Sequence, residues 1–326
     1  MSPAAAPGSS SFTVDAHGVH DRVDRELLEE HLAGDEFFWL DFHQPTAEEL
    51  SLLTDVFKFH PLAVEDADHF DQRPKIDTYD DFILVVAYGA NEDQDGLVEV
   101  HCFYSDRFLV TVHRDNCPTF DDLRRRAARD MALPAQGAMM LYLVLDALAD
   151  SFFPGLSQID DRIDELEDEM FKKPDDAQLQ ELFRLKRRLV GWRKVISPER
   201  DLFARIVTGV VAIPGMTSDT ERYYRDLYDH LIRISDLVDS YRDLLTGAMD
   251  VYLSTVSNRL NDVMRQLTMM STVFIPLTWI VGFFGMNFGW MVRHITGWGP
   301  FVLLAVMTQV VALAVTFVVF RRRGWI

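Results

Sequence analysis

The sequence predicts an α+β cytosolic domain, a long coiled-coil-like stalk helix and a two-helix transmembrane hairpin, in that order. Short apolar runs of strand length lie in the first third of the chain, and helical periodicity replaces them after residue 120. Two apolar runs without a charged residue, 267–284 and 295–320, lie near the C-terminus. A run of about 18 apolar residues is long enough to cross a bilayer as a helix.

Residues 1–20 are predicted to be a disordered start. They are rich in Pro, Ala, Ser and Gly, and they lack the apolar stretch of a signal peptide. Cys102 and Cys117 are the only cysteines of the chain. They lie in unrelated sequence contexts and form no disulfide framework, which fits a reducing compartment.

Residues 21–119 are predicted to form a cytosolic α/β domain. Residues 81–88 and 107–113 are apolar, β-branched runs bounded by turn residues, which predicts strands. Thr46 and Glu49 have the spacing of a capping box, which predicts the start of a short helix.

Residues 120–215 are predicted to be a cytosolic helical region. Residues 160–169 are strongly acidic with helical apolar spacing, and Pro174 stops this helix. The next helix, about residues 177–196, is basic. Because a tight turn joins the two, we expect an antiparallel pair whose charges mostly face solvent.

Residues 216–266 are predicted to be the stalk helix, since no proline interrupts the chain from Ser218 to Ile275. Apolar or small residues recur there with alternating spacings of four and three, which is typical of a coiled-coil seam. The seam residues are Leu227, Leu231, Ile234, Val238, Tyr241, Leu245, Ala248, Tyr252 and Thr255. The helix continues into the first apolar run, so it needs packing partners along its length.

The hairpin has four predicted parts. They are a first transmembrane helix at 267–286, an extracellular or periplasmic loop at 287–297, a second transmembrane helix at 298–320 and a cytosolic basic tail at 321–326. Arginines flank both spans on the side away from the loop, and the loop holds only Arg293 and His294. The positive-inside rule therefore predicts a multi-pass protein of the inner (plasma) membrane with both termini in the cytoplasm.

The charge composition argues against several classes of function. The net charge is −19, and all 51 Asp and Glu residues precede Met264. A domain this acidic is a poor candidate for nucleic-acid binding and a good candidate for attracting cations, although acidic surfaces also aid solubility. The sequence has no phosphate-binding Gly-x-x-x-x-Gly-Lys-Ser/Thr loop and no zinc-protease or hydrolase motif, so neither an ATP-driven pump nor an enzyme is expected.

The residues along one face of the stalk helix and the first span change from polar to apolar and back to polar, and they form a stripe. Its residues are Asp250, Ser257, Asn261, Met264, Leu267, Ser271, Ile275, Thr278 and Gly282, and it leads to Asn287. Such a stripe suits a gated pore, and it equally suits an ordinary helix that faces lipid or other helices. Two spans cannot enclose an aqueous path, so a pore would need several copies of the chain.

At the outer end of the first span, Gly285-Met286-Asn287 resembles the motif of the CorA family of magnesium transporters. Further stretches carry the resemblance, which spans most of the chain from about Phe37 to its end: His60-Pro-Leu-Ala-Val-Glu-Asp, Gln72-Arg-Pro-Lys, Tyr224-Arg-Asp-Leu-Tyr-Asp-His, Asn258-Arg-Leu-Asn and Phe274-Ile-Pro-Leu-Thr. The resemblance implies a homopentameric funnel in the lipid bilayer. It implies passive influx of Mg2+, with Co2+ and Ni2+ as further substrates, and no organic cofactor.

The resemblance also implies roles for individual residues. Asn287 would be the selectivity site, with Gly285 and Met286 shaping it. The pore-lining residues would be Thr278, Ile275, Ser271, Leu267, Met264, Asn261 and Asp250, with Met264 and Leu267 as a hydrophobic gate. Intracellular Mg2+ would close the channel by binding between cytosolic domains, at Glu65 and Asp66 of one subunit and at Asp146 and Asp226 of its neighbour.

The loop after the motif departs from the commoner family pattern. Residues 289–296 contain no carboxylate and one fixed positive charge, which weakens the attraction of cations to the mouth. This leaves open a zinc transporter of the same architecture, with or without coupling to protons. A membrane-anchored metal sensor that conducts nothing is a second alternative. The ten histidines are scattered, and His17 and His20 have the closest spacing, within the segment predicted to be disordered.

Overall fold

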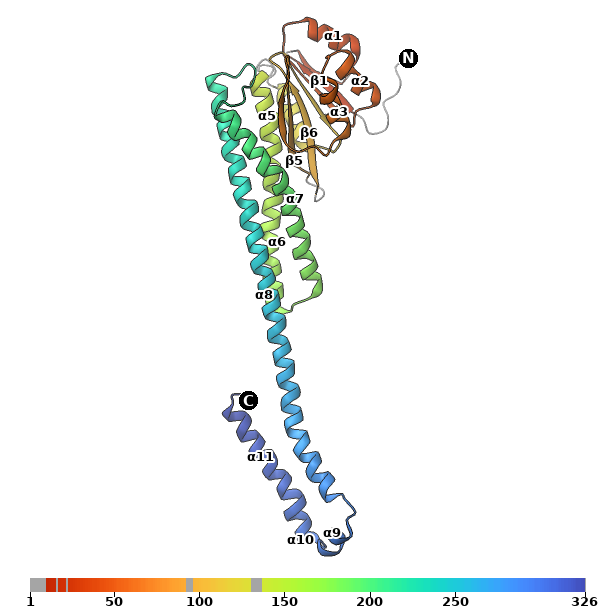
Figure 1. Cartoon of the computed structure of the whole chain (residues 1–326), viewed down its shortest axis with the longest axis vertical. Coiled ribbons are helices and arrows are strands. Elements are labelled where there is room, and N and C mark those ends of the chain that lie inside the picture. Colours follow the sequence, from red (N-terminus) through yellow and green to blue (C-terminus); the bar gives the residue numbers. More distant parts are fainter. Residues whose placement is uncertain (1–9, 16, 22, 92–95, 130–136, 326) are drawn as a thin grey trace. The chain divides into compact units, whose positions relative to one another are not determined.

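A computed structural model describes residues 10–15, 17–21, 23–91, 96–129 and 137–325 of the chain. The chain divides into two compact units, Met1–Asp250 and Val251–Ile326. The first unit contains a sheet and several helices, and the second contains mainly helices with long apolar runs (Figure 1).

Within the described residues, the sheet of the first unit has seven strands in the order β2-β1-β3-β7-β6-β5-β4. The strands are β1 (Ser10–Asp15), β2 (Gly18–His20), β3 (Phe38–His43), β4 (Lys75–Thr78), β5 (Ile83–Ala90), β6 (Leu97–Tyr104) and β7 (Phe108–His113). β3 pairs with β7 in parallel, and every other neighbouring pair is antiparallel. β5 and β7 confirm the two strands expected near residues 81–88 and 107–113.

The prediction of a disordered start up to residue 20 is wrong for its second half. Ser10–Asp15 and Gly18–His20 form an antiparallel hairpin, and β1 also pairs with β3. The Oδ1 atom of Asp15 accepts hydrogen bonds from the backbone N–H groups of His17 and Gly18, which fixes the turn. The apolar side chains of Phe12 and Val14 are buried. Their alternation with polar residues is typical of a strand, but it is too short to predict one within a segment of mainly polar composition. The first nine residues of that predicted segment lie outside the described part of the chain.

The sheet is covered by helices on both faces. In Figure 1, α1 (Arg25–Ala33), α2 (Ala47–Asp55) and α3 (Pro61–His69) lie on one side of the sheet and α5 (Gly137–Asp150) on the other. Because both faces are covered, every residue of β5 is buried, as its continuous apolar sequence requires. α4 (Pro118–Arg129) contacts β1 and β2.

Local sequence signals explain where these helices begin. Oγ1 of Thr46 accepts a hydrogen bond from the backbone N–H of Glu49, and Oε2 of Glu49 accepts one from the backbone N–H of Thr46, which confirms the capping box. His60 caps α3, and Pro61 occupies its first position, where a missing N–H costs nothing.

The helical region that follows contains α6 (Phe152–Lys172) and α7 (Asp176–Val207). Pro174 lies in the turn between them, as expected, and Asp175 caps α7. α7 continues beyond the predicted end at residue 196 because Pro198 is accommodated inside the helix. Ile159, Ile163 and Leu166 of α6 are buried, so its acidic residues are left on the outer side.

The longest helix, α8 (Ser218–Phe284), has 67 residues and is continuous through Pro276. Seam residues of the first unit are fully or almost fully buried: Leu227, Leu231, Ile234, Val238, Tyr241, Leu245 and Ala248. The hydroxyl of Tyr224 donates to the carbonyl of Ala138 at 2.9 Å and ties α8 to α5. The first unit therefore uses the first half of α8 as a core helix.

The second unit contains the end of α8, α9 (Gly289–His294), α10 (Trp298–Pro300), the π-helical η1 (Phe301–Val306) and α11 (Met307–Arg322). The apolar windows of α8 and of residues 298–322 are long enough to cross a membrane and are 0% buried. A third stretch of the described residues, 137–172, comprises α5 and α6 and passes the same test by composition, but 61% of its apolar window is buried. α9 lies within the segment predicted to be a loop.

Candidate functional site

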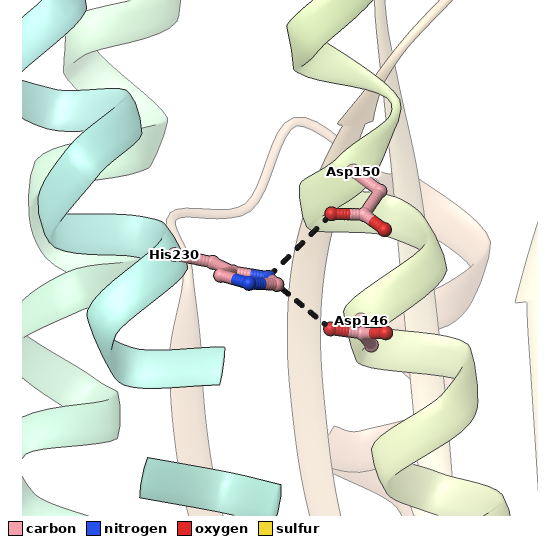
Figure 2. A group of neighbouring side chains, drawn as sticks. All are labelled: Asp146, Asp150 and His230. Atoms are coloured by element: carbon pink, nitrogen blue, oxygen red, sulfur yellow. Dashed lines mark ion pairs between the residues drawn. The ribbon is translucent and has the colours of Figure 1, made fainter. Parts of the chain in front are cut away.

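Three side chains of the first unit form a group that could hold a metal ion (Figure 2). Asp146 and Asp150 lie one turn apart on α5, and His230 lies on α8. Nδ1 of His230 is 3.6 Å from Oδ1 of Asp146 and 3.6 Å from Oδ1 of Asp150. One ligand atom of each residue lies within 4.8 Å of the others. Carboxylates suit divalent cations in general, and an imidazole adds affinity for transition metals.

The carboxylates of this group are held where negative charge is unfavourable. Burial raises the pKa of Asp146 and the charge of Asp150 raises it further, whereas His230 lowers it. Burial also raises the pKa of Asp150. Oδ1 of Asp146 and Nδ1 of His230 are buried and make no hydrogen bond with the part of the chain that the structure describes. A cation bound here would offset the repulsion between the two carboxylates, and these buried atoms would coordinate it. The residues therefore fit a divalent metal ion.

Asp226 lies at the edge of the group. Its Oδ2 atom is 3.8 Å from Nε2 of His230, one turn later on α8. The structure thus brings Asp146 and Asp226, two of the four acids predicted to bind metal, to the same histidine. Asp150 and His230 were not predicted from the sequence, although each follows one of those acids by four residues on a helix, which is the spacing of facing side chains.

Glu65 and Asp66 of α3 do not belong to this group within one chain. Glu65 is exposed and Asp66 is half-buried. Oδ2 of Asp66 is 2.6 Å from Nζ of Lys75, and Oδ2 of Asp77 is 2.8 Å from the same nitrogen. Burial lowers the pKa of Lys75, but the hydrogen bonds to the two carboxylates outweigh it and raise that pKa overall. A metal-binding role of Glu65 and Asp66 stays a prediction.

The Gly285-Met286-Asn287 motif begins where α8 ends. The N–H of Gly285 donates to the carbonyl of Val281 at 2.8 Å. A Cβ atom on Gly285 would lie 3.0 Å from that carbonyl oxygen, so the close approach favours glycine. Met286 and Asn287 follow in exposed positions.

A cavity of about 520 Å³ lies beside the motif within the second unit. Residues of α8, α9, η1 and α11 contribute to its lining, including Phe284, Met291 and Phe301. Asn287 and Gln309 supply its polar side chains. The Asn287 carboxamide is therefore a neutral hydrogen-bonding group in a cavity lined mostly by apolar residues.

The predicted pore-lining residues share one stripe of α8. At about 100° per residue they fall within roughly a third of the helix circumference. All are exposed apart from Ser271, which is half-buried; they are Asp250, Asn261, Met264, Leu267, Ser271, Ile275 and Thr278. Their role in conduction stays a prediction.

Comparisons with known proteins agree with this architecture. The CorA-like Mg2+ transporter protein family matches residues 34–322. The chain is 36% identical over 276 residues to the cobalt/magnesium transport protein CorA of Thermotoga maritima, covering 83% of this chain and 78% of that protein. It is 24% identical over 249 residues to the zinc transport protein ZntB of Yersinia enterocolitica, covering 75% of each.

Comparison with solved structures agrees with this family. The structure of the CorA magnesium transporter from Methanocaldococcus jannaschii matches with a TM-score of 0.82 at 23% identity, covering 97% of this chain and 98% of that one. The match includes the mixed sheet, the long helix and the C-terminal helix. The chain therefore belongs to the CorA-like Mg2+ transporter protein family, which is a family of membrane ion transporters rather than of enzymes.

Proposed function

We propose that the chain forms a homopentameric channel that lets divalent cations enter the cytoplasm passively, Mg2+ first and Co2+ and Ni2+ as well. The observation that carries this proposal is the continuity of α8. One uninterrupted helix bears Asp226 and His230 near its start and ends at the Gly285-Met286-Asn287 motif. The names of relatives that transport magnesium and cobalt support the choice of ion.

The chemistry of Asn287 suits a hydrated ion. Mg2+ is small and gives up its water reluctantly. A ring of neutral carboxamides would hydrogen-bond the water shell without stripping it, whereas a ring of carboxylates would hold the ion more tightly and slow its release. A membrane potential of 100 mV drives two charges inward by about 4.6 kcal/mol, so no ATP is needed.

The acidic groups of the first unit would regulate ion flow through the proposed pore. In the proposed pentamer, Glu65 and Asp66 of one subunit would hold intracellular Mg2+ together with Asp146 and Asp226 of the next. Bound Mg2+ would offset the repulsion between these carboxylates. It would close the channel by binding the closed state more tightly than the open state.

Ion flux into vesicles tests the proposal. Purified protein in liposomes should admit Mg2+, Co2+ and Ni2+ down their gradients, at rates that rise with an inside-negative potential and do not depend on a pH gradient. Flux of Zn2+ without flux of Mg2+ would overturn the choice of ion.

Zinc transport is the second candidate, and a specific observation favours it. Residues 289–296 hold no carboxylate and carry Arg293, so cation attraction at the mouth is weak. A zinc transport protein is also among the relatives. This candidate predicts Zn2+ flux that a proton gradient accelerates, in the same vesicles. A metal sensor that conducts nothing would show flux of neither ion.

A further inference from the structure

Asp66, a proposed ligand of the regulatory cation, already has a cationic partner in its own chain. Nζ of Lys75 donates to Oδ2 of Asp66 at 2.6 Å and lies 2.8 Å from Oδ2 of Asp77. The side chains of Lys75, Asp66 and Asp77 are 30%, 23% and 43% exposed. At this degree of burial, water and salt screen the charges less than on an open surface.

The position of Lys75 in the fold places its ammonium in contact with both acids. Lys75 and Asp77 are two residues apart on β4, so their side chains emerge on the same face of the strand. Among the described strands, β4 is the last of the sheet and pairs only with β5. Asp66 reaches the ammonium from α3, so the ion pair joins a helix to an edge strand through side chains.

A divalent cation at Asp66 must contend with this ammonium. Mg2+ binds proteins through one or two carboxylates and keeps most of its water. The ammonium occupies Oδ2, while Oδ1 of Asp66 makes no hydrogen bond within the described residues. Like charges a few ångströms apart repel strongly at a partly buried site. Binding of a divalent cation to Asp66 therefore requires the Lys75 ammonium to move away from that carboxylate.

We propose that Lys75 is an internal competitor of the regulatory cation at Asp66, and that Asp77 holds the ammonium when the cation displaces it. This inference rests on the proposed function, because it concerns how that function's regulatory site is loaded. Since Asp77 is already in contact with Nζ, displacement is a swing of one side chain rather than release of a charge into solvent. Lys75 thereby sets the Mg2+ concentration at which the channel closes.

The two contacts of Lys75 predict shifts of opposite sign. In full-length protein in nanodiscs, the midpoint of Mg2+-dependent protection from protease is measured against NaCl of equal ionic strength. Lys75→Met should lower the midpoint roughly five- to tenfold, because the repulsion is gone. Asp77→Asn should raise it roughly two- to threefold, because the ammonium then has only Asp66 and one local negative charge is lost. NaCl alone should protect neither variant.

Matched controls separate charge from packing. Lys194→Met makes the same substitution at an exposed lysine of α7 and should leave the midpoint unchanged. Lys75→Arg keeps the charge and should stay close to wild type. A shift in Lys75→Arg as large as that in Lys75→Met would overturn competition by charge.

The Asp66→Asn background distinguishes failure of this inference from failure of the proposed function. Wild-type Mg2+ protection in Asp66→Asn would show that the proposed regulatory site itself is wrong. Loss of protection in Asp66→Asn with no shift in Lys75→Met would overturn the competition alone. A lower midpoint for Lys75→Met that persists in Asp66→Asn would also overturn it, because the lysine would then act elsewhere.

Discussion

Glu199 is a carboxyl group in the core of the first unit. It lies on α7, is 3% exposed, and accepts a hydrogen bond from the backbone N–H of Tyr88 in β5. Burial raises its pKa from 4.5 to about 8, although the hydrogen bond acts in the opposite direction. Between these two pH values the folded chain keeps a proton that the unfolded chain loses. The contribution of Glu199 to the free energy of unfolding is therefore largest below pH 4.5 and is lost as the pH rises toward 8.

Glu199→Gln should make thermal stability less dependent on pH. The amide oxygen can still accept from Tyr88, and no charge has to be kept out of the core. At pH 8 we expect a Tm roughly 2–4 °C above wild type, with a smaller difference at pH 5. Differential scanning fluorimetry across this pH range measures it. Glu30→Gln, at an exposed position of α1, is the control, and an equal effect there would contradict the assignment.

Single residues also show where sequence analysis stops. The resemblance implied Asp146 and Asp226 as metal ligands, and the structure places both beside His230. His230 could not be predicted, since its contact with Asp146 depends on how α5 packs against α8. The sequence shows Lys75 only as the last residue of the Gln72-Arg-Pro-Lys stretch. Its ion pair with Asp66 depends on how α3 packs beside β4, so it could not be predicted.

Among the elements, the seam of α8 shows how strongly the exposure of neighbouring residues can differ. Leu245 is 0% exposed, whereas Leu244 is 47% exposed on the same turn. Sequence periodicity predicted this seam because four-three spacing forces one face of a helix inward. It did not predict β1 and β2, whose few apolar residues lie in a polar segment.

Leu245→Ala should destabilise the first unit by about 2–5 kcal/mol, because it removes a buried side chain and leaves a cavity. Leu244→Ala, next in the chain, should cost about 0.5 kcal/mol or less. Thermal or denaturant unfolding of the full chain compares the two. Equal losses would contradict the burial of the seam.

The end of α11 is closed by a cap within the second unit. Gly324 has a φ of +66°, a conformation that favours glycine. The N–H of Trp325 donates to the carbonyl of Phe320 at 3.0 Å, and the two rings stack. Arg265 of α8 donates to the carbonyls of Gly324 and Trp325 at 3.1 and 3.0 Å. The cap therefore joins the two long helices of this unit.

Gly324→Ala should loosen this cap by about 1 kcal/mol, because an L side chain is strained at positive φ. Hydrogen exchange of the Trp325 amide should become about fivefold faster. Gly247→Ala on α8, where an added Cβ meets nothing within 4 Å, should leave that exchange unchanged. Exchange at Trp325 that is as slow as in wild type would contradict the cap.

At the scale of the whole molecule, the chain combines an acidic first unit with C-terminal helices whose apolar windows are not buried. All 51 acidic residues precede Met264, and the two C-terminal apolar windows are 0% buried. The two long apolar helices near the C-terminus could be predicted because a charge-free run of about 18 residues or more is typical of a membrane-spanning helix. The number of subunits could not be derived from one chain, because it depends on contacts between copies.

The central claim is that divalent cations pass the membrane at Asn287. It is tested most directly by Mg2+ influx into proteoliposomes containing wild type, Asn287→Ala or Asn258→Ala. Asn258 is an exposed asparagine of α8 outside the predicted stripe and serves as the matched control. We predict rapid influx for wild type and Asn258→Ala, and a loss of roughly tenfold or more for Asn287→Ala, equivalent to about 1.4 kcal/mol in the barrier. Influx through Asn287→Ala at the wild-type rate, or no influx through the wild type at all, would contradict the claim.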